Sequence, residues 1–155
     1  METKDKIISA LNDLLTRNYD AEKGFEQAAD NAIDPNLVTF FKTYTEQRYR
    51  FGHDLKGEIV AIGGEVDKGS SITGDIHRTW IDIKTALSKK NDKSVIEECI
   101  RGEEKALNDY QEVLDMEELP YSTRTIIESH MRKIREAVAQ LKELDGVYAN
   151  EVHAN

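Results

Sequence analysis

Hydrophobic residues recur every three or four positions along several long stretches of the chain, which is the spacing of one face of an α-helix. Asp34 followed by Pro35 is a signal for a helix start, and Gly63 is a signal for a helix end. No alternating pattern typical of strands is present. The sequence predicts an all-α protein with long helices over about residues 4–30, 35–62, 95–116 and 122–145, and a shorter helix over about 74–89.

The lengths of the connections indicate how these helices are arranged. Short links join the first long helix to the second and the third to the fourth, so each pair should form an antiparallel hairpin. The link between the hairpins is long, and its helix over 74–89 can travel the height of a bundle at ~1.5 Å per residue. The third long helix would then start beside the start of the second. This is the ferritin-like four-helix bundle, although a plain bundle with the short helix packed on one end also fits. We expect a single domain over residues 1–146, ending at Gly146, and a frayed tail over 147–155.

Several polar residues fall on the apolar stripes of the predicted helices. Glu22 and Asn18 lie on the stripe of the first helix, Arg48 on that of the second and Glu103 on that of the third, at roughly one height. A buried charge costs several kcal/mol unless it is paired. We therefore expect a Glu22–Arg48–Glu103 ion network that fixes the helix register, with Asn18 and the hydroxyls of Tyr44 and Tyr110 completing its hydrogen bonds.

The same layer allows a second interpretation, a carboxylate site for iron or manganese. Its ligands would be Glu22, Glu103 and His130, which lies about one turn below the layer. Di-iron bundles use a Glu from each of two helices and Glu-x-x-His from the other two. This sequence has no Glu-x-x-His, and Arg48 would bring a positive charge to the layer. The ion network is therefore the favoured interpretation.

A third interpretation starts from the segment His53 to Gly57, which resembles the His-x-x-Lys-Gly signature of histidine phosphotransfer domains. His53 is predicted to face solvent, Lys56 could neutralise a phosphate, and Gly57 would let a partner approach on the same face. The alternative is an ordinary solvated helix face, because a match of five residues arises easily in charged helices.

Charge and composition disfavour several classes of partner and cellular location. The net charge of −9 disfavours nucleic acid and anionic membrane surfaces as partners. No apolar run reaches the ~18 residues of a membrane span, and the charged N-terminus does not resemble a signal peptide. Cys99 is the only cysteine, so an internal disulfide is excluded and a reducing cytoplasm is expected.

Three segments, residues 20–25, 74–80 and 101–110, resemble in order and spacing a bacterial family of ferritin-like four-helix-bundle proteins classed as a domain of unknown function. The resemblance covers most of the chain. It implies the ferritin-like fold and draws attention to Glu22 and Glu103, but it implies no activity. We therefore expect a non-enzymatic bundle protein that can form homo-oligomers through its helix faces. The metal protein and the phosphotransfer module remain as alternatives.

Overall fold

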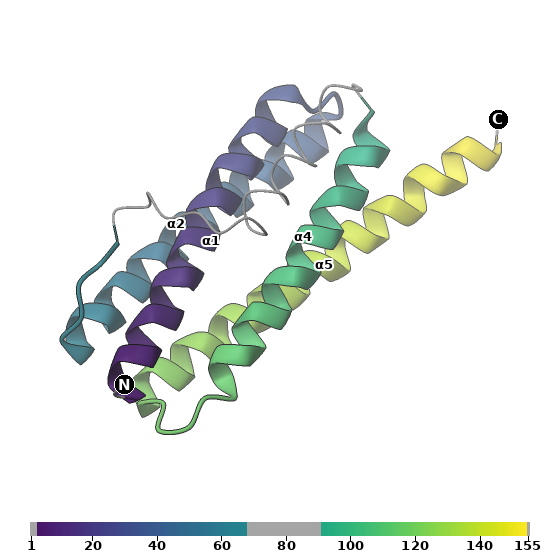
Figure 1. The fold of residues 1–155 in the computed structure, drawn as a ribbon. Helices are drawn as coiled ribbons and strands as arrows, with labels where there is room; N and C mark the ends of the chain where they lie inside the picture. The colour runs from purple at the N-terminus through teal and green to yellow at the C-terminus, as the bar shows by residue number, and fades with distance from the viewer. Residues whose placement is uncertain (1–2, 68–90, 155) are drawn as a thin grey trace.

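The computed structural model describes residues 3–67 and 91–154 (Figure 1). In this part of the chain the predicted all-α fold is confirmed. The predicted helix over 74–89 lies outside the described residues. Four long helices make up the bundle: α1 (Thr3–Asn31), α2 (Pro35–Ile62), α4 (Asp92–Leu114) and α5 (Tyr121–Ala154).

The helices form two antiparallel hairpins, α1–α2 and α4–α5, as predicted (Figure 1). Helix α4 begins beside the turn between α1 and α2. There the carboxylate of Asp92 accepts hydrogen bonds from the backbone amides of Ile33, at 3.3 Å, and Asp34, at 3.1 Å. Helices α2 and α4 therefore start at the same end of the bundle and run parallel. The predicted ferritin-like arrangement of two hairpins joined by a long crossover is confirmed.

Most helix ends follow the capping signals in the sequence. The Asp34 side chain accepts a hydrogen bond from the Asn36 amide at 2.8 Å, and Gly63 ends α2 in the left-handed conformation, with φ of 92°. Helix α4 starts at Asp92, three residues earlier than expected, because the Asn91 side chain caps it. The predicted helix end at Gly146 is wrong, since α5 continues to Ala154. A glycine weakens a helix by about 0.5–1 kcal/mol but ends it only where the chain can turn away.

The core consists of two hydrophobic clusters, one at each end of the bundle. One cluster contains Leu15, Phe51 and Ile134, and the other contains Phe25, Phe41 and Leu141. On α2 the boundary between them falls between Tyr44 and Phe51, and on α4 between Cys99 and Tyr110. A layer of buried polar residues occupies this boundary.

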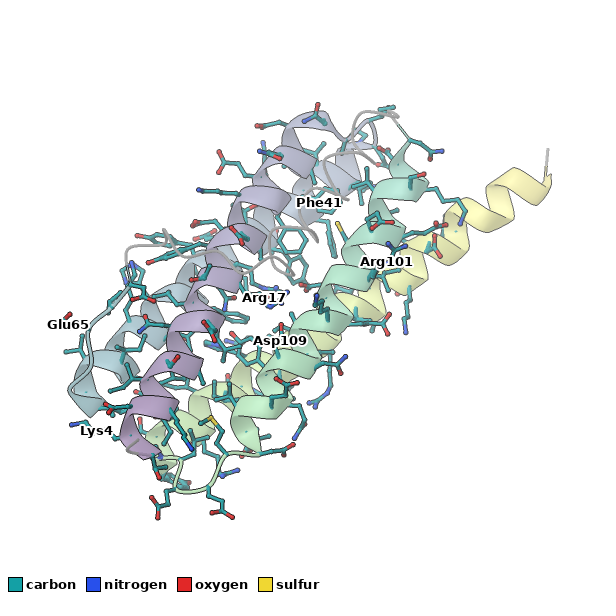
Figure 2. The ribbon with its side chains drawn as sticks, viewed as in Figure 1. Lys4, Arg17, Phe41, Glu65, Arg101 and Asp109 are labelled. Atoms are coloured by element: carbon teal, nitrogen blue, oxygen red, sulfur yellow. The ribbon has the colours of Figure 1, made fainter. Side chains whose placement is uncertain are left out.

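Polar contacts link the two hairpins across the bundle. Arg17 of α1 forms an ion pair with Asp109 of α4 (Figure 2). Tyr44 of α2 donates a hydrogen bond to Gln140 of α5 at 2.9 Å.

None of the described helices is both long and apolar enough to cross a membrane.

Candidate functional site

The centre of the polar layer is an ion pair between α2 and α4. Arg48 and Glu103 are 2% and 3% exposed, so both charges are shielded from water. The guanidinium donates from Nη1 to Oε1 of Glu103 at 2.7 Å and from Nη2 to Oε2. Both carboxylate oxygens are therefore engaged by the same arginine, which is the strong bidentate geometry of arginine and carboxylate.

Two aromatic rings hold the guanidinium in place. Its central carbon lies 5.4 Å from the ring centroid of Phe25 and 5.4 Å from that of Phe51. The third nitrogen, Nε, donates a longer hydrogen bond of 3.4 Å to Gln47. The rings come from the two different hydrophobic clusters, so Arg48 is packed between the two halves of the core.

A second chain of hydrogen bonds runs through all four helices. The Asn18 amide nitrogen on α1 donates to the Tyr110 hydroxyl on α4 at 2.9 Å. That hydroxyl lies 2.9 Å from Nδ1 of His130 on α5, and Nε2 of His130 lies 2.9 Å from Oδ2 of Asp54 on α2. A carboxylate only accepts, so the His130 proton is on Nε2 and Nδ1 accepts from Tyr110. All the donors then point one way, from Asn18 toward Asp54.

Burial changes the titration of the groups in this chain. His130 is 1% exposed and stacks on Phe51 with ring centroids 3.8 Å apart. Burial lowers the pKa of His130 from 6.5 to about 4, although the hydrogen bond to Asp54 opposes the shift. Burial likewise raises the pKa of the Tyr110 hydroxyl. At neutral pH both groups are therefore uncharged inside the bundle.

The structure does not place Glu22 in the ion network predicted for it. Glu22 is half-buried, and among the described residues it forms no ion pair with Arg48. Burial raises the pKa of its carboxyl, and the neighbouring charge of Glu26 adds to the rise. Glu103 alone contacts both terminal nitrogens of Arg48.

The donor set does not fit the carboxylate metal site that the ferritin-like fold implies. Glu103 is engaged by Arg48, and the two ring nitrogens of His130 are occupied by Tyr110 and Asp54. Within the described residues, no group of three or more His, Cys, Asp or Glu side chains is placed to hold a metal ion. Arg48 also brings a positive charge to the position of a cation.

The predicted phosphotransfer residues lie on the outer face of α2. His53 is exposed, with its ring edge-on to that of Tyr49 at 4.8 Å between centroids. A side chain added at Gly57 would meet nothing within 4 Å, so the surface there is open. The ammonium of Lys56, however, lies 5.3 Å from the ring centroid of Tyr19 on α1. The phosphotransfer site stays a prediction.

Asp54, the partner of His130, was not predicted from the sequence. Helical phase places Asp54 at the edge of the α2 stripe, where a half-exposed acid is common. The signal that could have found it is the unpaired His130 on the apolar face of α5, because a buried ring with two nitrogens needs two partners.

Comparison with known protein families finds one family model that matches most of the chain. Residues 6–116, which run from α1 to just past the end of α4, match a domain of unknown function, DUF2383. The protein belongs to this family. The match includes Asn18, Arg48 and Glu103 but ends before α5, which carries His130. A comparison with curated proteins finds no match.

Two solved structures are similar in fold to this DUF2383 protein. One is the bacterioferritin-related protein from Bacteroides fragilis, described as a dodecameric thioferritin, with a TM-score of 0.79, 16% identity, and coverage of 99% of this chain and 92% of the other. The second is Dps92 from Deinococcus radiodurans, with a TM-score of 0.73, 15% identity, and coverage of 92% and 87%. At these identities the likeness shows the ferritin-like fold.

Proposed function

We propose that this protein is a non-enzymatic ferritin-like bundle in which an ion pair, instead of a metal, occupies the buried polar layer of the core. The observation that carries the proposal is the bidentate contact of Arg48 with Glu103 in the buried layer between the two core clusters. An arginine so placed supplies the counter-charge that a cation would otherwise supply to the carboxylate. The layer is then complete without a cofactor, and its role is to hold the four helices in one register.

Metal analysis tests this proposal. The full chain is purified without chelator, incubated with excess Fe(II) or Mn(II), desalted and analysed for bound metal, and melted with and without chelator. We expect no stoichiometric metal and the same melting temperature in both buffers. Stoichiometric iron or manganese that is lost in the double variant Glu22→Ala, Glu103→Ala would overturn the proposal in favour of a carboxylate metal protein.

We further propose that the bundle works as a homo-oligomer in the cytoplasm. The similar Bacteroides fragilis protein is described as dodecameric. Large apolar side chains are exposed on this chain, including Tyr49 at 55% and Val60 at 63% on α2 and Tyr121 at 84% on α5. The single thiol, Cys99, is buried, which suits a reducing compartment. Light scattering coupled to size exclusion should give a mass that is a multiple of 17.7 kDa, and a monomer at micromolar concentration would refute this.

A further inference from the structure

A groove of about 580 Å³ runs along the outside of the bundle between α2 and α5. Its walls are mostly polar side chains of α2, with one lysine from α5, and Phe51 forms part of its lining. The volume lies in the range of small-ligand sites, about 300–1,000 Å³. Neither Arg48 nor Glu103 lines the groove, so a ligand could bind there whether or not that pair takes the place of a metal.

The charges along the groove divide into one internal pair and two uncompensated groups. Arg50 and Glu46 neutralise each other through an ion pair of 2.6 Å. The carboxylate of Asp54 is 50% exposed, and its partner His130 is an uncharged ring at neutral pH because burial holds the pKa of His130 at about 4. Lys133 is exposed and has no carboxylate partner among the described residues. One negative and one positive charge therefore face the groove without neutralisation.

Among the described residues no ion pair joins Asp54 to Lys133, and both lie beside the same part of the core. Oδ2 of Asp54 is held by His130, which stacks on Phe51. The ammonium of Lys133 lies 6.0 Å from the ring centroid of the same Phe51. The carboxylate and the ammonium come from two different helices, and the buried ring of Phe51, 2% exposed, lies beneath both. This is a site with a negative group on one helix and a positive group on the next.

We propose that this groove binds a small zwitterion, a molecule with a protonated amine and a carboxylate joined by a short apolar linker. Its amine contacts Asp54, its carboxylate contacts Lys133, and its linker spans the groove between them. A singly charged ligand leaves one of the two protein charges uncompensated. Because both charges are partly exposed, affinity is on the order of millimolar and depends on linker length.

The test is an NMR titration of the full-length protein with a homologous series of probes: glycine, 4-aminobutyrate and 6-aminohexanoate. Butyrate and butylammonium serve as singly charged controls. We expect one of the longer amino acids to bind most tightly and to shift the amide resonances of residues 43–54 and those around Lys133. The ring resonances of His130 should shift as well, because His130 holds the carboxylate that receives the amine.

Two variants and one control examine the assignment. Lys133→Gln and Asp54→Asn should each weaken binding of the best probe by about five-fold, the upper range for a partly exposed charge pair. Asparagine keeps an acceptor for His130, so Asp54→Asn removes the charge without removing the hydrogen bond. Lys142→Gln, an exposed lysine of α5 near Glu104 of α4, should leave binding unchanged. Thermal melts confirm that each variant is folded.

Several results would overturn the zwitterion site. Binding of butyrate as tight as that of the best amino acid would mean that Lys133 alone makes an anion site. Equally tight binding of butylammonium would mean that Asp54 alone attracts cations. Absence of shifts with every probe, or an equal loss of binding in Lys142→Gln, would show that the groove is not a site for this class of ligand.

Discussion

Replacing Arg48 by methionine removes the charge of the buried pair while keeping an apolar stem between Phe25 and Phe51. Glu103 then keeps its negative charge at 3% exposure without a counter-charge. Breaking one side of a buried pair typically costs about 3–5 kcal/mol. For a chain of this size each kcal/mol lowers the melting temperature by about 2–4 °C, so we expect a fall of about 10 °C at neutral pH.

The assay is thermal and urea unfolding of four proteins: wild type, Arg48→Met, Glu103→Gln, and the double variant. The double variant should recover much of the loss, because it buries no net charge. The loss in Arg48→Met should also shrink in acid, since a stranded carboxylate gains by taking up a proton. The matched control is Arg50→Met, the same change two residues along α2, where the pair with Glu46 is 71% and 64% exposed. Loss of such an exposed pair should lower the free energy of unfolding by no more than about 0.5 kcal/mol.

An Arg48→Met variant as stable as wild type at neutral pH would refute the role given to the buried pair. A double variant no more stable than Arg48→Met would refute it as well, since the cost would then come from lost packing. A chelator effect on wild type that disappears in Glu103→Gln would point instead to a metal in the layer.

The other buried groups can be tested in the same way. The pKa of His130 is about 4 in the folded protein and 6.5 in the unfolded chain, so its contribution to the free energy of unfolding is complete above pH 6.5 and is lost as pH falls toward 4. Urea unfolding should show this loss as about 3 kcal/mol. His130→Gln, but not His53→Gln, should reduce the dependence of the free energy of unfolding on pH. Burial raises the pKa of Cys99, so Ellman's reagent should react with it only after unfolding; rapid reaction of the native protein would contradict its burial. Glu58 accepts hydrogen bonds from Ser122 at 3.2 Å and Thr123 at 2.8 Å, so Glu58→Ala should cost about 1 kcal/mol in the same unfolding assay, whereas an unchanged midpoint would show these bonds to be replaced by water.

The acid sensitivity of His130 comes first from burial, which disfavours the charged ring, and the hydrogen bond with Tyr110 adds a second cause. When the ring takes up a second proton, both nitrogens donate, and Nδ1 can no longer accept from Tyr110. The Tyr110 oxygen can accept from both Asn18 and His130, but its own hydrogen then loses the acceptor that it has in the neutral state. An unsatisfied buried donor costs about 1–3 kcal/mol, which acts in the same direction as the burial of the charged ring.

Much of the fold could be predicted from the sequence because its signals are local. Helical periodicity indicated the long helices, and Asp34 with Pro35 and Gly63 indicated two of their ends. The length of the link between the hairpins predicted that α2 and α4 run parallel. The helix end predicted at Gly146 was wrong because a glycine is only a weak helix breaker. Nothing in the sequence distinguishes a glycine within an exposed helix from one at the end of a helix.

The candidate site was less predictable because its contacts depend on rotation and height to within a fraction of a helical turn. Periodicity indicated that Arg48 and Glu103 lie on core faces, but it could not decide which acid Arg48 would bind. Glu22 lies one heptad from Leu15 and falls at the edge of the core, where it is half-buried. Asp54 and His130 are separated by 76 positions, and only the tertiary arrangement brings them together.

The polar contacts of α2 form a ladder that fixes how the two hairpins lie against each other. Going along α2, Tyr44, Asp54 and Glu58 contact positions of α5 that fall in number, from Gln140 through His130 to the pair Ser122 and Thr123. Arg48 contacts α4 between the first two of these levels. Hydrophobic contact is not directional, so apolar faces alone would tolerate a slip of one helical turn, about 5.4 Å. Such a slip would break all of these contacts at once, leaving Arg48 buried without Glu103 and His130 with Tyr110 as its remaining partner. Since a buried ion pair contributes little net stability compared with a well-packed apolar replacement, we regard the choice of a single register as the main effect of this ladder.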